Sequence, residues 1–152
     1  MNWTCLRFQQ LGVDDLYDAL ALRAAVFVVE QGCIFQDADG ADRAGSHLLG
    51  RDAAGVLQAY LRIVDPGVKF TEPSLGRVIT SPASRGSGLG HRLVDEGIAH
   101  CESAWPGRAI RIGAQARLEA FYAEHGFARE GGDYIEDGIP HCEMVLKPAV
   151  RA

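Results

Sequence analysis

The sequence predicts a mixed α/β domain of the α+β type, in which a mixed, mostly antiparallel sheet carries helices on both faces. Three observations lead to this fold class. The predicted elements run strand, helix, three strands, helix, strand, helix and two strands, so helices alternate with strands. The 152 residues suffice for one buried core. The chain contains no linker-like or repeated segment, so we expect a single domain over residues 1–152.

The first half of the chain predicts three strands and one helix. Apolar residues alternate in the strands, and they recur at helical spacing from Leu16 to Phe27. Asp14 precedes this helical stretch and is the expected N-cap. The predicted elements are a strand over 3–8, a helix over 14–30, a loop over 31–46 and a hairpin of 47–51 with 56–64.

The second half predicts a strand, a glycine-rich turn and a long amphipathic helix, which Pro106-Gly107 ends. A short strand and a second helix follow, and His125-Gly126 ends that helix. A closing antiparallel hairpin then turns at 136–138. The predicted elements are strands over 75–80 and 109–113, helices over 89–105 and 116–124, and hairpin strands over 127–134 and 141–147.

Composition and charge exclude several classes of function. The chain is 47% hydrophobic and 23% charged, as ordinary globular domains are. A net charge of −5 argues against a general nucleic-acid surface. No apolar run is long enough to span a membrane, and the first residues do not resemble a signal peptide. We therefore expect a cytoplasmic protein without a nucleic-acid or membrane partner.

The cysteine and aspartate patterns predict no metal site. The cysteines lack the close pairs of a zinc site. Asp37, Asp39 and Asp42 do not have the glycine and glutamate spacing of a calcium-binding loop. We interpret these aspartates as part of a polar turn. The widely spaced cysteines are Cys5, Cys33, Cys101 and Cys142.

The turn at 81–90 is the most informative segment. Gly86, Gly88 and Gly90 let the backbone approach an anion closely at the start of a helix, and Arg85 adds a charged donor. This arrangement suits a pyrophosphate, although a turn that only changes chain direction is the alternative. A Rossmann site would need the turn after the first strand, and a P-loop would need Gly-Lys-Ser/Thr. Neither pattern is present.

Segment 85–90 resembles the acyl-CoA signature of the GNAT N-acetyltransferase superfamily. Segment 118–127, with Phe121-Tyr122 and Gly126-Phe127, is similar to that superfamily's second landmark. The resemblance extends to the ElaA-type subgroup and covers nearly the whole chain. Thr80 departs from a common Val, and Gln115 departs from a common Asn. The segments similar to the subgroup are 25–31, 36–42, 76–79, 113–116 and 136–141.

The resemblance implies the GNAT acyl-CoA N-acyltransferase fold, in which strands 75–80 and 109–113 splay apart around the pantetheine arm of acetyl-CoA. It implies acetyl-CoA as cosubstrate, with pantetheine amides paired to the backbone of the earlier strand. A strand N–H would then polarise the thioester carbonyl. The implied cofactor-binding residues are Val78, Ile79, Thr80, Arg85, Gly86, Ser87, Gly88, Leu89, Gly90, Gln115 and Tyr122.

Three residues are candidates for catalysis. Tyr122 would protonate the departing thiolate, and the alternative is a tyrosine that only packs on the sheet. Glu30, at the end of the first helix, and His141, near the start of the last strand, would border the acceptor cleft. Either would bind or deprotonate an ammonium group. The alternatives are an exposed carboxylate at a helix end and a histidine fixed at a turn.

The predicted function is transfer of an acetyl group from acetyl-CoA to a primary amine, small-molecule or peptidyl, by direct attack in a ternary complex. The alternative is a non-catalytic acyl-CoA-binding regulatory module. Loop 31–46 and turn 135–141 should converge over the thioester, and their acidic residues would attract a cationic acceptor. The acceptor's identity and the oligomeric state, a homodimer included, stay open. The acidic set is Glu30, Asp37, Asp39, Asp42, Glu136 and Asp137.

Overall fold

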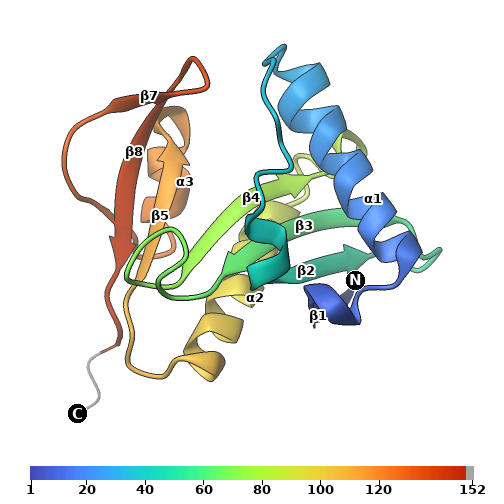
Figure 1. Ribbon diagram of the computed structural model, residues 1–152, viewed down its shortest axis with the longest axis horizontal. Coiled ribbons are helices and arrows are strands. Elements are labelled where there is room, and N and C mark those ends of the chain that lie inside the picture. The colour runs from blue at the N-terminus through green and yellow to red at the C-terminus, as the bar shows by residue number, and fades with distance from the viewer. Residues whose placement is uncertain (150–152) are drawn as a thin grey trace.

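The computed structural model describes residues 1–149 as two antiparallel sheets that meet along β4 and β5 (Figure 1). The first sheet has the order β1-β2-β3-β4, and in the second β8 pairs with β5, β6 and β7. The strands are β1 Asn2–Arg7, β2 Gly45–Arg51, β3 Leu57–Val64, β4 Ser74–Thr80, β5 Ile110–Gln115, β6 Ala128–Arg129, β7 Tyr134–Glu136 and β8 Ile139–Leu146.

Helices cover both faces of the first sheet, which confirms the predicted fold class. The first helix lies on one face and α2 lies behind the sheet (Figure 1). The first helix changes from α to π geometry before it ends at Glu30. The helices are α1 Val13–Arg23, η2 Ala24–Glu30, α2 Leu89–Ala104 and α3 Glu119–Ala123, with short 3₁₀ turns η1 Phe8–Gln10, η3 Ala41–Ala44, η4 Pro82–Ser84 and η5 Ala116–Leu118.

Alternation along β3 supplies both layers of the core. Tyr60 packs in the cluster on the α1 side, whereas Leu61 and Ile63 pack in the cluster that contains α2. Gly97 of α2 lies so close to β3 that a Cβ there would come within 2.8 Å of a Leu61 methyl group. This close approach explains a glycine in the middle of a helix, where it otherwise costs stability.

Strands β4 and β5 are neighbours only where they begin. Arg111 N–H donates to the carbonyl of Pro73 at 3.1 Å, and no ladder joins the two strands over the described residues. Beyond this contact they diverge, as Figure 1 shows. A bulge in β4 adds to the separation, because Arg77 and Val78 together lie opposite Leu61 of β3. Arg77 adopts a φ of 51°, which is unusual for a residue other than glycine.

Two buried arginines share one aspartate beneath the first helix. Arg23 and Arg62 are each 1% exposed, and they bind Asp42 Oδ1 through their Nη1 atoms at 2.7 and 2.9 Å. Burial alone would raise the pKa of Asp42, but the hydrogen bonds and charges of both arginines outweigh it, so the pKa is lowered. The neighbouring His47 donates from Nε2 to the Asp42 carbonyl at 2.9 Å, and its Nδ1 is hydrogen-bonded to Tyr60 Oη at 2.7 Å.

Two further aspartates connect this centre to the β4 bulge. Asp37 binds Arg23 and Arg77, both at 2.8 Å. Asp39 binds Arg62 at 2.7 Å and Arg77 at 3.4 Å. The Arg77 side chain also donates to the Asp37 carbonyl at 3.0 Å, which helps to hold the strained residue. We refer to Arg23, Arg62, Arg77, Asp37, Asp39 and Asp42 as the Arg–Asp network.

Two local predictions are wrong. Helix α1 begins at Val13 after Gly12, so Asp14 is not its N-cap, and Asp15 Oδ2 instead accepts from Gly12 N–H at 3.4 Å. Segment 127–134 is not one strand, because Gly131-Gly132 interrupts it and leaves β6 and β7 as short separate strands. The predicted turn is found, with Asp137 and Gly138 both at positive φ between paired Glu136 and Ile139.

Residues 1–149 lack two features, a membrane-spanning helix and a metal-binding cluster. No helix there is both long and apolar enough to cross a membrane. The same residues contain no cluster of three or more His, Cys, Asp or Glu side chains arranged to hold a metal ion.

Asp42→Asn should destabilise the protein by about 3–5 kcal/mol, because it leaves two buried guanidinium groups without a shared anion. Urea unfolding at pH 7 measures the loss. Asp18→Asn is the control, since Asp18 forms a more exposed pair with Arg51 at 3.0 Å and should cost at most about 1 kcal/mol. Equal losses would contradict the importance of the network.

The same contribution depends on pH. Because the pKa of Asp42 is lowered in the folded state, the stabilisation is fully present above the unfolded pKa of about 4. It is lost as the pH falls below that value. The wild-type protein should therefore lose more stability than Asp42→Asn between about pH 5 and pH 3, measured by the same unfolding experiment.

Candidate active site

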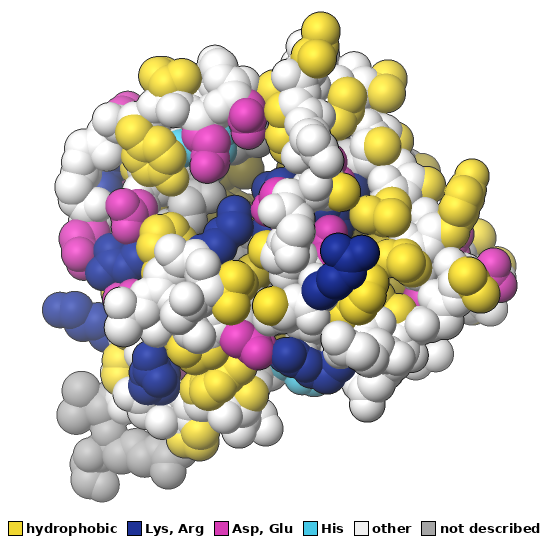
Figure 2. Space-filling view, viewed as in Figure 1, with side chains coloured by type: hydrophobic (Ala, Val, Ile, Leu, Met, Phe, Trp, Pro, Cys, Tyr) yellow, Lys and Arg dark blue, Asp and Glu magenta, His cyan; other side chains and the backbone are white. Residues whose placement is uncertain are grey.

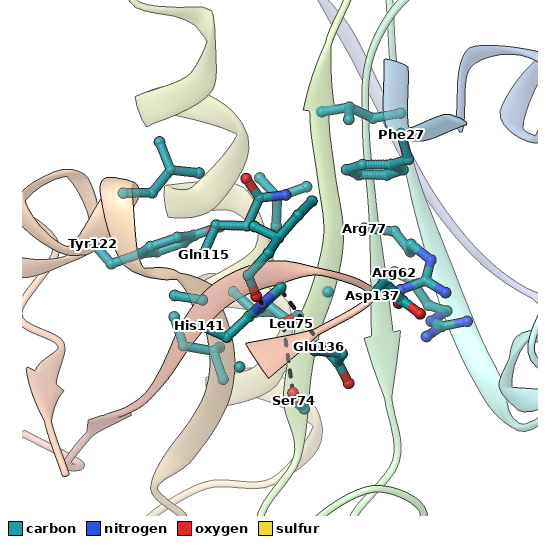
Figure 3. A pocket seen from close by; sticks show the side chains of 18 of the residues that line it. Phe27, Arg62, Ser74, Leu75, Arg77, Gln115, Tyr122, Glu136, Asp137 and His141 are labelled. Atoms are coloured by element: carbon teal, nitrogen blue, oxygen red, sulfur yellow. Dashed lines mark hydrogen bonds and ion pairs between the residues drawn. The ribbon is translucent and has the colours of Figure 1, made fainter. Parts of the chain in front are cut away.

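A cavity of about 800 Å³ lies between β4 and β5, in the region where these strands separate. Its walls also include the end of the first helix, the segment that follows it, and the β7–β8 hairpin. Figure 2 shows acidic side chains and a histidine beside the hollow between the two arms of the molecule. Figure 3 looks into the cavity and shows Tyr122, His141, Gln115 and Glu136 around its centre.

The cavity contains most of the residues that the sequence singled out. All three catalytic candidates are among its lining residues, together with the β4 residues and Arg85. The glycine turn that follows Arg85 is not part of the lining. The predicted residues that line the cavity are Glu30, Val78, Ile79, Thr80, Arg85, Gln115, Tyr122 and His141. Those outside it are Gly86, Ser87, Gly88, Leu89 and Gly90.

The glycine turn has the geometry of an anion site at a helix start. Gly86 and Gly88 have φ of 83° and 80°, a conformation that side chains other than hydrogen disfavour. Gly88 is the N-cap of α2, so the first N–H groups of that helix have no partner within it. A Cβ at Gly90 would come within 3.6 Å of the Phe121 ring, so this glycine lies against α3.

Tyr122 has a buried ring and a hydroxyl without a partner. The residue is 6% exposed, and its ring packs edge-on against Phe121 and Phe127. The Tyr122 hydroxyl forms no hydrogen bond within residues 1–149, and the residue lines the cavity. Burial raises the pKa of the phenol, so it stays protonated at neutral pH. A neutral phenol in a cavity can donate a proton.

His141 presents one free ring nitrogen to the cavity. The residue is 9% exposed, and its Nδ1 lies 2.7 Å from the carbonyl of Ile139. A carbonyl only accepts, so Nδ1 carries the proton and the neutral ring keeps its lone pair on Nε2. Nε2 lies 3.6 Å from Glu136 Oε2, and the ring stacks on Tyr134. This tautomer is the one that a general base needs at Nε2.

Glu30 is paired with Arg85. The guanidinium holds both carboxylate oxygens, with Nη2 to Oε2 at 2.7 Å. This hydrogen bond lowers the pKa of Glu30, which makes the carboxylate a weaker base. The pairing therefore argues against Glu30 as the general base. The pair also links Glu30, which was predicted to border the acceptor cleft, to Arg85, which was predicted to bind the cofactor.

The prediction of a six-residue acidic surface for a cationic acceptor is wrong for most of its members. Glu30 is neutralised by Arg85, and the three aspartates of the loop belong to the Arg–Asp network. Glu136 and Asp137 are the members without a Lys or Arg within ion-pair distance, among the described residues. The loop and the turn do meet, because Cys33 Sγ donates to the Asp137 carbonyl at 3.1 Å.

Several lining residues were not singled out by the sequence. Tyr134 stacks on His141, and its hydroxyl lies above Gly113 of β5, where a Cβ would approach it to 2.8 Å. Cys33 fastens the hairpin, and Arg77 stands at the bulge. A glycine inside a strand often indicates that another group approaches the backbone closely, so Gly113 could have indicated the neighbouring Tyr134 hydroxyl. No sequence pattern indicates the contacts of Cys33 and Arg77.

Comparison with known proteins identifies the family. The family model described as an acetyltransferase (GNAT) domain matches residues 42–148. The chain belongs to the GNAT acetyltransferases. ElaA of Escherichia coli K12 is 42% identical over 146 residues, which cover 95% of each protein. This relative confirms the ElaA-type resemblance, and it covers segments outside the matched domain.

Solved structures agree with this membership. The crystal structure of E. coli ElaA matches this GNAT chain with a TM-score of 0.89 at 40% identity, over 96% of this chain and 99% of ElaA. An acyl-CoA N-acyltransferase from Pseudomonas aeruginosa matches with a TM-score of 0.90 at 40% identity, over 95% of this chain and 98% of that one. The protein is an acyltransferase with the GNAT fold, and no observation favours a non-catalytic binding module.

Glu30→Gln should strengthen the binding of CoA, because it frees Arg85 to contact phosphate. We expect the Kd measured by calorimetry to fall roughly two- to fivefold, the size of effect that one exposed ion pair has. Glu119→Gln is the control, since Glu119 is 43% exposed like Glu30 and pairs with Arg129 outside the cavity. Unchanged or weaker CoA binding in Glu30→Gln would contradict the exchange of partners.

Proposed function

We propose that this GNAT enzyme transfers the acetyl group of acetyl-CoA to a primary amine by direct attack in a ternary complex. One observation carries the proposal. Two polar groups, the Tyr122 hydroxyl and His141 Nε2, open onto the same cavity and have no hydrogen-bond partner among the described residues. A potential acid and a potential base that are both free and accessible in one cavity favour a reacting ligand there.

The cofactor fits the cleft in two parts. The pyrophosphate would lie at the glycine turn, where Gly88 begins α2 and Arg85 supplies a charge. The pantetheine arm would enter between β4 and β5 and pair with the edge of β4 that faces the gap. The bulge at Arg77 and Val78 leaves these residues out of regular pairing with β3. A β4 N–H near the bulge would then donate a hydrogen bond to the thioester oxygen and stabilise its developing negative charge.

The chemistry divides between the two unsatisfied groups. His141 Nε2 takes a proton from the ammonium form of the acceptor, which leaves a neutral amine. Its nitrogen attacks the thioester carbon, so a C–N bond forms and the C–S bond breaks. The thiolate takes the phenol proton of Tyr122, and the second proton that the nitrogen loses restores the phenol. The proton on His141 is released to solvent.

Tyr122→Phe tests the proposed acid. We expect kcat to fall roughly 10²–10⁴-fold, as for a positioned acid–base group, with CoA affinity little changed. Release of free thiol, measured over a set of primary amines, gives the rate, and calorimetry gives the affinity. Full activity in the variant, with product release shown not to limit the rate, would leave Tyr122 as a packing residue only.

Gly88→Ala tests the cofactor site. The methyl group would occupy space beside the first turn of α2, and we expect CoA affinity to fall roughly tenfold through the loss of one charged hydrogen bond. Gly107→Ala is a matched control, because Gly88 and Gly107 have φ of 80° and 77° and a Cβ at either meets nothing within 4 Å. The backbone strain is then similar in both. Equal CoA affinities would contradict the site.

A further inference from the structure

Glu136 is the carboxylate closest to the proposed base. The cavity is lined by four carboxylates, of which Glu30 is held by Arg85 and Glu143 by Arg111 at 3.3 Å. Glu136 Oε2 has one basic nitrogen within 4 Å over residues 1–149, the Nε2 atom of His141 at 3.6 Å. The fourth carboxylate is that of Asp137, which follows Glu136 in the sequence but has different neighbours.

The side chains of Glu136 and Asp137 in the β7–β8 hairpin lie on different sides of the cavity. Figure 3 shows Asp137 on the side of the cavity where Arg62 and Arg77 lie, whereas Glu136 points away from them, on the side of His141. The position of Glu136 is set by its pairing with Ile139 across a two-residue turn. The turn is fastened to the opposite wall by Cys33 Sγ, at 3.1 Å from the Asp137 carbonyl. The Glu136 side chain is 55% exposed, and its carboxylate is a negative charge beside the lone pair of Nε2.

An accessible ring nitrogen without a hydrogen-bond partner, beside a free carboxylate, suits an ammonium group. A ligand nitrogen can lie within hydrogen-bond distance of both Nε2 and Glu136 Oε2, because these two atoms are 3.6 Å apart. An ammonium can donate to both at once. After its proton has moved to Nε2, the new imidazolium N–H faces Glu136, so the carboxylate stabilises both the bound reactant and the charged base.

We propose that Glu136 selects acceptors that arrive as ammonium ions, that is, aliphatic primary amines, and positions them on His141. This inference rests on the proposed function. Glu136 itself takes no proton in this scheme. A weakly basic aromatic amine is neutral at pH 7 and has no charge for Glu136 to recognise.

Benzylamine and aniline test this selection, because they are similar in size but only benzylamine is an ammonium ion at pH 7. For Glu136→Gln we expect KM for benzylamine to rise roughly tenfold, as for the loss of a charged hydrogen bond, while KM for aniline changes by less than about twofold. Thiol release from acetyl-CoA gives both constants. A purely structural defect would affect the two amines alike.

Asp137→Asn is the matched control, since it removes the same charge from the adjacent residue and asparagine tolerates the positive φ of 51°. We expect it to leave the ratio of the two KM values unchanged. An equal effect of Glu136→Gln on both amines, or no effect, would overturn this inference alone. Absence of thiol release with either amine in the wild type would overturn the proposed function and the inference together.

Discussion

The placement of two buried guanidinium groups is the constraint on which the rest of the structure depends. Arg23 comes from α1 and Arg62 from β3, and both are almost wholly removed from solvent. A buried charge costs several kcal/mol unless anions and hydrogen-bond acceptors surround it. All three aspartates that meet this need lie in the segment after the first helix. That segment is therefore held against the sheet by charge, although it has little regular structure.

The same network reaches the candidate active-site cavity through Arg77. The arginine occupies the β4 bulge with a left-handed backbone, and Asp37 holds its side chain. The bulge separates β4 from regular pairing at the level where the cavity opens. The polar loop that forms one wall of the cavity thus helps to fix the β4 backbone that faces the proposed cofactor. A second contact joins the two walls of the cavity, because Cys33 Sγ in the segment after the first helix donates to the Asp137 carbonyl in the β7–β8 hairpin.

Local patterns in the sequence were sufficient for the order of elements and for the glycine turn. Periodicity reports which face of an element is buried, and a glycine at a helix start reports backbone conformation, so both can be read within a few residues. The interrupted strand at Gly131-Gly132 was missed because β8 supplies partners on both sides of the interruption. Asp14 was favoured as a cap by type alone, whereas the chain enters the helix at Gly12.

The errors within the site have a different cause. Glu30 and Arg85 are 55 residues apart, and no spacing rule links them. Asp37 and its neighbours look like a solvated acidic turn until their arginine partners, 14 to 40 residues away, are known. Charge counts along a sequence cannot distinguish a free carboxylate from a neutralised one. Only the folded chain separates Glu136 from the other acidic residues of the predicted set.

The few contacts of the short strand β7 affect how related enzymes can diverge in acceptor specificity. Over the described residues β7 pairs with β8 alone, and its only link to the opposite arm is the Cys33 contact. The core clusters contain no residue between Phe127 and Cys142. Insertions, deletions and exchanges in 130–138 would therefore reshape the mouth of the acceptor cavity at little cost to folding. The proposed cofactor cleft would then lie between strands of the core, and the proposed choice of acceptor in a segment outside the core clusters that can change in sequence.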